Sequence, residues 1–235
     1  MTSPVLASDF PSASRPTLSE TDRLASPATS PRPAPQTDRF AAAFAVVLGH
    51  EGGYTADPTD PGNWTGGAPG RGECRGTNWG ISAASYPDLP IRALTSDQAR
   101  TIYRRDYWDR VRGDRLPAPL ALLVFDAAVN CGVGRAARWL QGVLGVAQDG
   151  VVGEVTLAAL ARRIGSRIEG LAVPGETRSA RSGSFADGGT LQICSDFQAA
   201  RLLYMTSLPT WKRFGGGWAK RLCRLPFEAI RMEMP

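Results

Sequence analysis

Apolar side chains recur every three or four residues through most of the chain beyond residue 39, and this spacing constrains the fold more than any other feature. One apolar stripe consists of Leu120, Leu123, Val124, Ala127 and Ala128, and a second consists of Ala136, Leu140, Val143 and Leu144. Positions three and four apart share one face of an α-helix, whereas alternate positions share one face of a strand. With Gly132 and Gly134 between them, the two stripes predict a hairpin of two helices.

Several other segments carry the same helical signal. The sequence FAAAFAVVLGHEGGY, residues 40–54, predicts a helix of about three turns that ends at Gly52 and Gly53, because glycine leaves helical geometry readily. Glu51 would then lie at the C-terminus of that helix. Thr95 and Gln98 match a capping box at the start of another helix. Further helices are expected over residues 154–164, 191–207 and 216–231.

Between these helical segments, residues 55–80 are rich in Gly, Pro, Asp and Asn. These residue types favour turns and disfavour helix interiors, so the segment predicts a long ordered loop or a short hairpin. The fold class is therefore mostly α, with any strands short and confined to residues 55–80. Residues 170–189, which are rich in Gly, Ser and Arg, predict a second loop.

The composition fits one sizeable core with a tail in front of it. The chain has 235 residues, of which 43% are hydrophobic. Residues 1–38 consist mainly of Ser, Thr, Pro and Ala and predict a disordered tail. No apolar run approaches the roughly 20 residues that a membrane span needs, and no secretory signal is recognised at the start. We therefore expect synthesis in the cytoplasm without stable membrane insertion.

Charge and residue types exclude several classes of function. The formal net charge of +5 suits an anionic partner, but the arginines are spread along the chain and match no nucleic-acid-binding motif. His50 and Glu51 begin an HExxH pattern that fails at Tyr54, and the chain has no second histidine, so we expect no metal site. The four cysteines show no CxxC spacing, and both disulfides and buried free thiols remain open.

A series of motifs resembles one enzyme family. HEGGY, DPTDPGNW and GTNWGIS, in this order, resemble the start of glycoside hydrolase family 108, the muramidases of phage endolysins and secretion-associated wall hydrolases. The resemblance continues through LTSDQARTIYRRDYW, LPAPLALLVFDAAVNCG and ARWLQGVLGVAQDGVVGEVTLAAL, and so covers most of residues 40–162. The later segment FQAARLLYMTSLPTWKRFGGGWAKR is similar to the predicted peptidoglycan-binding region of these proteins.

This resemblance implies a lysozyme-like helical domain whose long loop or small hairpin lies near the active site. Residues 39–165 would form the catalytic domain, and residues 166–235 a peptidoglycan-binding-like helical region packed on it. The implied activity is hydrolysis of the β-1,4 bond between N-acetylmuramic acid and N-acetylglucosamine in peptidoglycan glycan strands. No cofactor is expected, since acid catalysis on a glycoside needs only carboxyl groups and water.

The family pattern makes Glu51 the catalytic acid. An apolar helix and the negative end of its dipole would both raise the pKa of Glu51, which suits a proton donor. Asp60 is the candidate second carboxylate, with Asp57 in reserve, although aspartates before proline are also common turn formers. The insertion WTGGAPGRGECR after Asn63 leaves the placement of Asp60 relative to Glu51 open.

Other polar and aromatic residues are assigned by their types and positions. The candidate substrate-binding residues are Tyr54, Thr77, Asn78, Trp79 and Trp218. The polar members would bond sugar hydroxyls or tie down the loop, and the aromatic rings would stack on sugars. Asp126 and Asn130 share one helix face and predict a buried hydrogen-bonded pair with a structural role.

Two other functions remain as alternatives. The QDG-containing segment also resembles wall-binding repeats, so a non-enzymatic peptidoglycan-binding module is the first of them. A lytic transglycosylase with the same glutamate is the second. In each case we expect a monomer, delivered by a holin or a secretion apparatus, that acts in the periplasm or cell wall.

Overall fold

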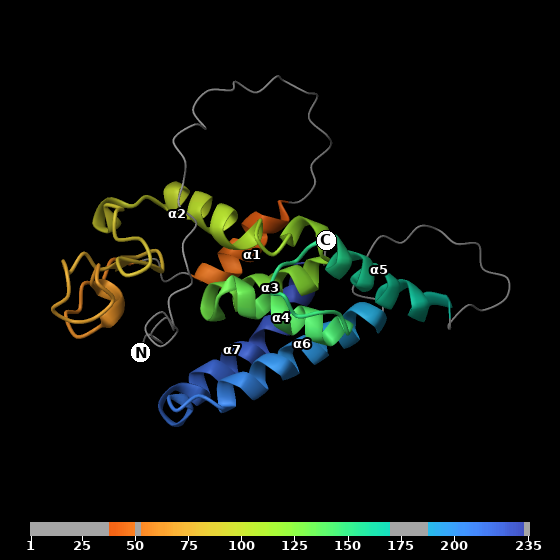
Figure 1. Cartoon of the computed structure of the whole chain (residues 1–235). Coiled ribbons are helices and arrows are strands. Elements are labelled where there is room, and N and C mark those ends of the chain that lie inside the picture. Colours follow the sequence, from red (N-terminus) through yellow and green to blue (C-terminus); the bar gives the residue numbers. More distant parts are fainter. Residues whose placement is uncertain (1–37, 50–52, 170–187, 233–235) are drawn as a thin grey trace, which may run out of the picture.

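The computed structural model describes residues 38–49, 53–169 and 188–232, and this part of the chain is mostly α-helical (Figure 1). The α-helices are α1 (Arg39–Leu48), α2 (Ser96–Tyr103), α3 (Ala118–Cys131), α4 (Val133–Leu144), α5 (Glu154–Glu169), α6 (Gly188–Thr206) and α7 (Trp211–Arg231). The short elements are η1 (Pro61–Asn63), η2 (Ile91–Ala93) and η4 (Gly113–Arg115), the π-helical turn η3 (Arg104–Trp108), and the strands β1 (Thr77–Asn78) and β2 (Ile81–Ser82). The predicted fold class is confirmed.

Helix α3 is the centre of the molecule. All of its residues except Ala118 and Val129 are buried, and it contacts α1, α4, α6 and α7. A helix that is apolar on every side belongs in a core, because no face of it gains from contact with water. Within the part of the chain that the structure describes, none of the helices is both long and apolar enough to cross a bilayer.

The predicted hairpin of α3 and α4 is confirmed. The two helices meet at Gly132, whose φ of 90° lies in the region that favours glycine, and Gly134 is already inside α4. Helices α6 and α7 pack against α3, and α6 also packs against α4 (Figure 1). Phe197 of α6 and Leu225 of α7 belong to the same apolar core as Phe40 of α1. The domain boundary predicted at residue 165 falls inside α5.

Some predicted element limits were wrong. Helix α1 ends at Leu48 rather than at Gly52, because Gly49 takes a φ of 61° and leaves the helix first. Glu51 therefore follows the end of α1 instead of lying in its last turn. Strand β2 lies just beyond residue 80, because Trp79 and Gly80, both with positive φ, form the turn of the hairpin.

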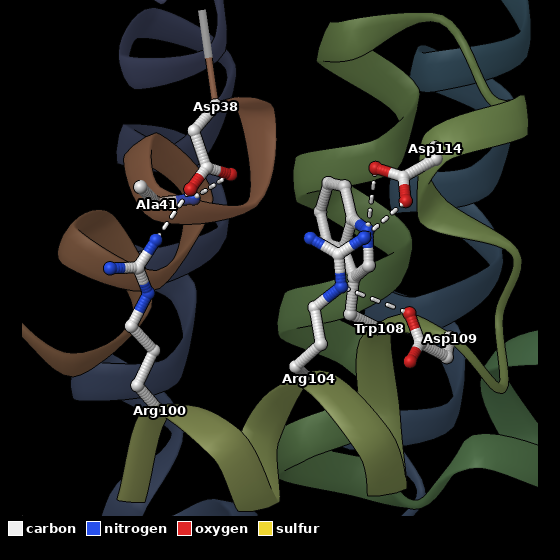
Figure 2. Close-up of polar contacts among 7 residues, drawn as sticks. All are labelled: Asp38, Ala41, Arg100, Arg104, Trp108, Asp109 and Asp114. Atoms are coloured by element: carbon white, nitrogen blue, oxygen red, sulfur yellow. Dashed lines mark hydrogen bonds and ion pairs between the residues drawn. The ribbon is translucent and has the colours of Figure 1, made fainter. Parts of the chain in front are cut away.

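Ion pairs fix the first turn of α1 against α2 (Figure 2). Asp38 accepts a hydrogen bond from the Ala41 backbone N–H at 3.1 Å and so caps α1, and its other carboxylate oxygen pairs with Arg100 of α2. Arg104 pairs with Asp109 and Asp114, and the Trp108 indole also donates to Asp114 at 3.0 Å. The start of α1 is thus held by a side chain of the neighbouring helix.

The capping box of α2 is confirmed. The Gln98 N–H donates to Thr95 Oγ1 at 3.3 Å, and the Thr95 N–H donates to Gln98 Oε1 at 2.9 Å.

All four cysteines are free thiols in this structure, and two of them, Cys131 and Cys194, are buried.

Candidate active site

The segment from Gly53 to Leu94 forms a lobe on one side of the helices (Figure 1). The Thr55 N–H donates to the Thr77 carbonyl at 2.9 Å, and the Thr77 N–H donates to the Thr55 carbonyl at 2.8 Å. Since β1 pairs in turn with β2, three short stretches of extended chain lie side by side. This pairing places Thr55, four residues after Glu51 in the sequence, against β1.

Asn63 organises the interior of the lobe, and the sequence analysis did not single it out. Its side chain is fully buried, donates to the Asp57 carbonyl at 2.9 Å and accepts from Thr77 Oγ1 at 2.7 Å. Its own carbonyl accepts from the N–H groups of Arg75 and Gly76. A single amide thereby joins the DPTDPG turn to β1. In the sequence, the feature that could have indicated this role is an asparagine within a segment rich in turn-forming residues.

Asp60 and Asp57 both hold turns. Asp60 caps η1, and its Oδ1 accepts from the Gly62 N–H at 2.8 Å. Asp57 Oδ1 accepts from the Thr59 N–H at 2.8 Å and from the Thr59 hydroxyl at 2.7 Å. The Thr59 backbone and side-chain hydrogen bonds keep the pKa of Asp57 below its ordinary value. Among the described residues, the Oδ2 atoms of both aspartates accept no hydrogen bond.

Thr77, Asn78 and Trp79 lie next to one another on the hairpin, but their polar atoms face the protein. Asn78 is buried, and its amide nitrogen lies within hydrogen-bond distance of the Ile91 carbonyl at 3.1 Å and the Leu94 carbonyl at 3.2 Å. The Trp79 indole also donates to the Leu94 carbonyl, at 2.9 Å. These contacts favour the loop-supporting alternative, because the same donors would otherwise serve a sugar.

Tyr54 is the most exposed of the predicted substrate-binding residues that the structure describes. Its side chain retains 38% exposure, and its hydroxyl donates to the Arg75 carbonyl at 3.3 Å. The Arg92 guanidinium lies over the ring, 5.3 Å from the centroid. Gly76 allows this packing, since a Cβ there would lie 2.7 Å from the ring. The lobe therefore presents a fixed aromatic ring three residues after Glu51.

Trp218 lies elsewhere, in a second apolar cluster formed by α6 and α7. It is only 6% exposed and packs with Met205 and Leu222. The Phe214 ring stacks on it at 6.0 Å between centroids. A ring covered in this way fills a core, so its position does not favour the sugar stacking that the sequence suggested. Glu51 itself lies outside the described residues.

The predicted buried hydrogen-bonded pair of Asp126 and Asn130 is confirmed, although the bond uses the Asp126 backbone and not its carboxylate. The Asn130 amide donates to the backbone carbonyl of Asp126 at 2.7 Å. The fully buried Asp126 carboxylate instead pairs with Arg201 of α6 and Arg221 of α7. Burial alone would raise the pKa of Asp126, but the two guanidiniums outweigh it and hold the pKa below the ordinary aspartate value.

The segment that resembles a wall-binding repeat is held together by Gln141. This side chain is 1% exposed, and its amide nitrogen donates to Asp149 Oδ1 at 2.6 Å and to the Val151 carbonyl at 3.0 Å. Its amide oxygen accepts from the Gly150 N–H at 2.9 Å. The polar atoms of Gln141 therefore serve the turn between α4 and α5.

Gln141→Ala is expected to lower the free energy of unfolding by about 1–3 kcal/mol, because it removes the hydrogen bonds by which the buried Gln141 amide holds this turn. Urea denaturation followed by circular dichroism measures the change. Gln148→Ala is the matched control, since Gln148 is exposed on the same connection. Equal stability of the two variants would show that the turn does not depend on Gln141.

Comparison with known proteins adds to this geometry. The model of the family described as Glycosyl hydrolase 108 matches residues 44–132. The solved structure of Brucella abortus SagA is 32% identical, with a TM-score of 0.59, over 83% of this chain and 96% of that chain. No curated protein matches the chain.

Proposed function

Because the chain belongs to glycosyl hydrolase family 108, we propose that it cleaves the β-1,4 bond between N-acetylmuramic acid and N-acetylglucosamine in peptidoglycan. The family makes the protein a glycoside hydrolase with a mostly α, lysozyme-like fold. The single observation that carries the finer proposal is the family match over residues 44–132, which includes Glu51 and the complete lobe.

Glu51 is the proposed catalytic acid. Glycoside cleavage needs a carboxyl group that is protonated near neutral pH and can donate to the leaving oxygen. Glu51 stands between the end of α1 and the Thr55 pairing with β1, so ordered structure bounds it on both sides.

Asp60 is the proposed second carboxylate, which orients a water or stabilises the positive charge that develops on the sugar ring. Its Oδ1 is used by the Gly62 N–H, and this bond fixes the orientation of the carboxylate. Asp57 remains the reserve. Asn63 connects both aspartates to its own segment, because its side chain donates to the Asp57 carbonyl and its backbone N–H donates to the Asp60 carbonyl. Thr55, which precedes them, pairs with Thr77 of β1.

Tyr54 is the proposed sugar contact with the strongest support, because it is exposed, is held by Arg75 and Arg92, and follows the proposed acid by three residues in the sequence. Thr77 and Trp79 are half-buried on the same lobe and are proposed as secondary contacts. We also propose that the protein acts in the periplasm or cell wall after release by a holin or a secretion apparatus.

Product analysis tests the reaction. Purified peptidoglycan is digested with the wild-type protein, reduced with borohydride and analysed by mass spectrometry. We expect fragments that end in reducible N-acetylmuramic acid, since water takes the place of the leaving sugar. Heat-denatured protein serves as the control for background release.

The two other functions give different products. Anhydro ends, which resist reduction, would identify a lytic transglycosylase. Sedimentation of the protein with peptidoglycan without release of fragments would identify a wall-binding module. Ends that carry reducible N-acetylglucosamine would move the cleaved bond to the other linkage of the strand.

A further inference from the structure

A buried ion cluster joins four helices at one end of α1. Asp126 of α3 is fully buried, and its Oδ2 accepts from Arg201 Nη1 of α6 at 2.7 Å. Its Oδ1 accepts from Arg221 of α7, with Nε at 2.9 Å and Nη2 also within bonding distance. Arg201 is as buried as Asp126, whereas Arg221 is half-buried. Both cations come from helices beyond the family-matched region.

Arg221 also reaches α1. Its Nη2 donates to the Val47 carbonyl at 3.3 Å. The last carbonyls of a helix have no partner within the helix, and its C-terminus carries partial negative charge, so a guanidinium satisfies both. Because Asp38 pairs with Arg100 at the other end of α1, the helix is held at both ends by side chains of other elements (Figure 2).

The residues of the cluster are not those expected of a cluster whose main role is to stabilise the fold. Two guanidiniums face one carboxylate, and Arg201 Nε and Nη2 are buried with no hydrogen-bond partner among the described residues. Buried ion clusters are often no more stable than apolar side chains of similar volume, because removing charges from water is costly. What the cluster does fix is geometry, since each bond tolerates little displacement.

We propose that Arg221 is a positioning residue for hydrolysis, because it ties the Val47 carbonyl to Asp126 and so sets where the chain leaves α1, four residues before Glu51. This inference rests on the proposed function. Displacing a reacting group by about 1 Å costs on the order of 100-fold in rate, so a small shift at the end of α1 affects catalysis. On this view α7 completes the catalytic part of the protein.

Arg221→Met tests the proposal. Methionine keeps an apolar stem against the core and leaves Asp126 paired one-to-one with Arg201, so the variant should fold. We expect kcat on soluble peptidoglycan fragments to fall about 10- to 100-fold. KM should stay within about twofold, because Arg221 does not touch the substrate. The assays are run well below the melting temperature of each variant.

Two further variants separate positioning from general stabilisation. Arg221→Lys retains a cation and a donor and should recover part of the lost kcat. Arg224→Met makes the same change three residues along α7, where Arg224 is exposed and pairs with Glu228, and should retain wild-type kcat. Circular dichroism melts show whether each variant is folded at the assay temperature.

Some outcomes would overturn the proposal. One is wild-type kcat in folded Arg221→Met, even with a lowered melting temperature, since that is what a merely structural role predicts. Another is an equal loss of kcat in Arg224→Met. If Arg221→Met does not fold, Arg221→Gln, which carries no charge, takes its place, and wild-type kcat in that folded variant has the same meaning. Full activity of Glu51→Gln would instead overturn the proposed acid, so the two failures are distinguishable.

Discussion

Glu51→Gln is expected to lower kcat for peptidoglycan cleavage by about 10²–10⁴-fold, the contribution typical of a general acid. Glutamine has nearly the same size and shape as glutamate, but its amide has no acidic proton to give to the leaving oxygen. The melting temperature should stay near the wild-type value, because the substitution nearly preserves the size and shape of the side chain. Release of reducing ends from purified peptidoglycan measures the rate, and circular dichroism measures folding.

Glu73→Gln is the matched control for this experiment. Glu73 is an exposed glutamate of the same lobe whose carboxylate pairs with Arg75 at 2.7 Å, so the same chemical change removes no proposed catalytic group. Equal rates for the two variants would remove Glu51 as the acid. In that case the rates of Asp60→Asn and Asp57→Asn would be compared to find which aspartate is needed. Asparagine removes the charge of each aspartate but can still cap the turn.

Helices and their ends were predictable where the signal is local. The capping box of Thr95 and Gln98 needs residues three apart, and the hairpin of α3 and α4 needs only the spacing of apolar residues. The end of α1 was placed too late because Gly49 competes with Gly52 and Gly53. Which of several glycines leaves the helix depends on the residues packed against it.

Side-chain partners distant in sequence were not predictable. The hydrogen bond between Asp126 and Asn130 was predictable because they lie four residues apart, but the carboxylate of Asp126 bonds to arginines 75 and 95 residues away. Sequence spacing indicates that a polar residue is buried and therefore needs a partner. The identity of that partner depends on how α6 and α7 pack against α3.

The candidate site shows the same difference between local signals, which were predictable, and contacts between distant residues, which were not. A long loop or short hairpin was predictable for residues 55–80, because the turn-forming residues that indicate it lie near one another in the chain. The role of Asn63 depends on contacts with both Asp57 and Thr77, which only the folded lobe brings together. Trp218 was a candidate for stacking on a sugar because of its aromatic ring. Instead, α7 includes the three glycines before it and turns the indole toward Met205.

Asp126→Ala is expected to lower the free energy of unfolding by about 3–5 kcal/mol. The variant leaves the fully buried Arg201 guanidinium without its anion, and removing one partner of a buried pair costs far more than replacing the whole pair. Chemical denaturation at neutral pH measures the loss. Asp109→Ala is the control, because Asp109 forms an exposed pair with Arg104, and such pairs contribute roughly 0–1 kcal/mol.

The pH dependence of this effect has a definite sign. A carboxyl group whose folded pKa is lowered stabilises the fold fully above its ordinary value of 3.8, and that stability is lost as the pH falls through the lower folded pKa. The difference in stability between wild type and Asp126→Ala should therefore be constant above this value and narrow below it. A difference that stays constant into stronger acid would mean that the charge of Asp126 is not what holds α6 and α7 against α3.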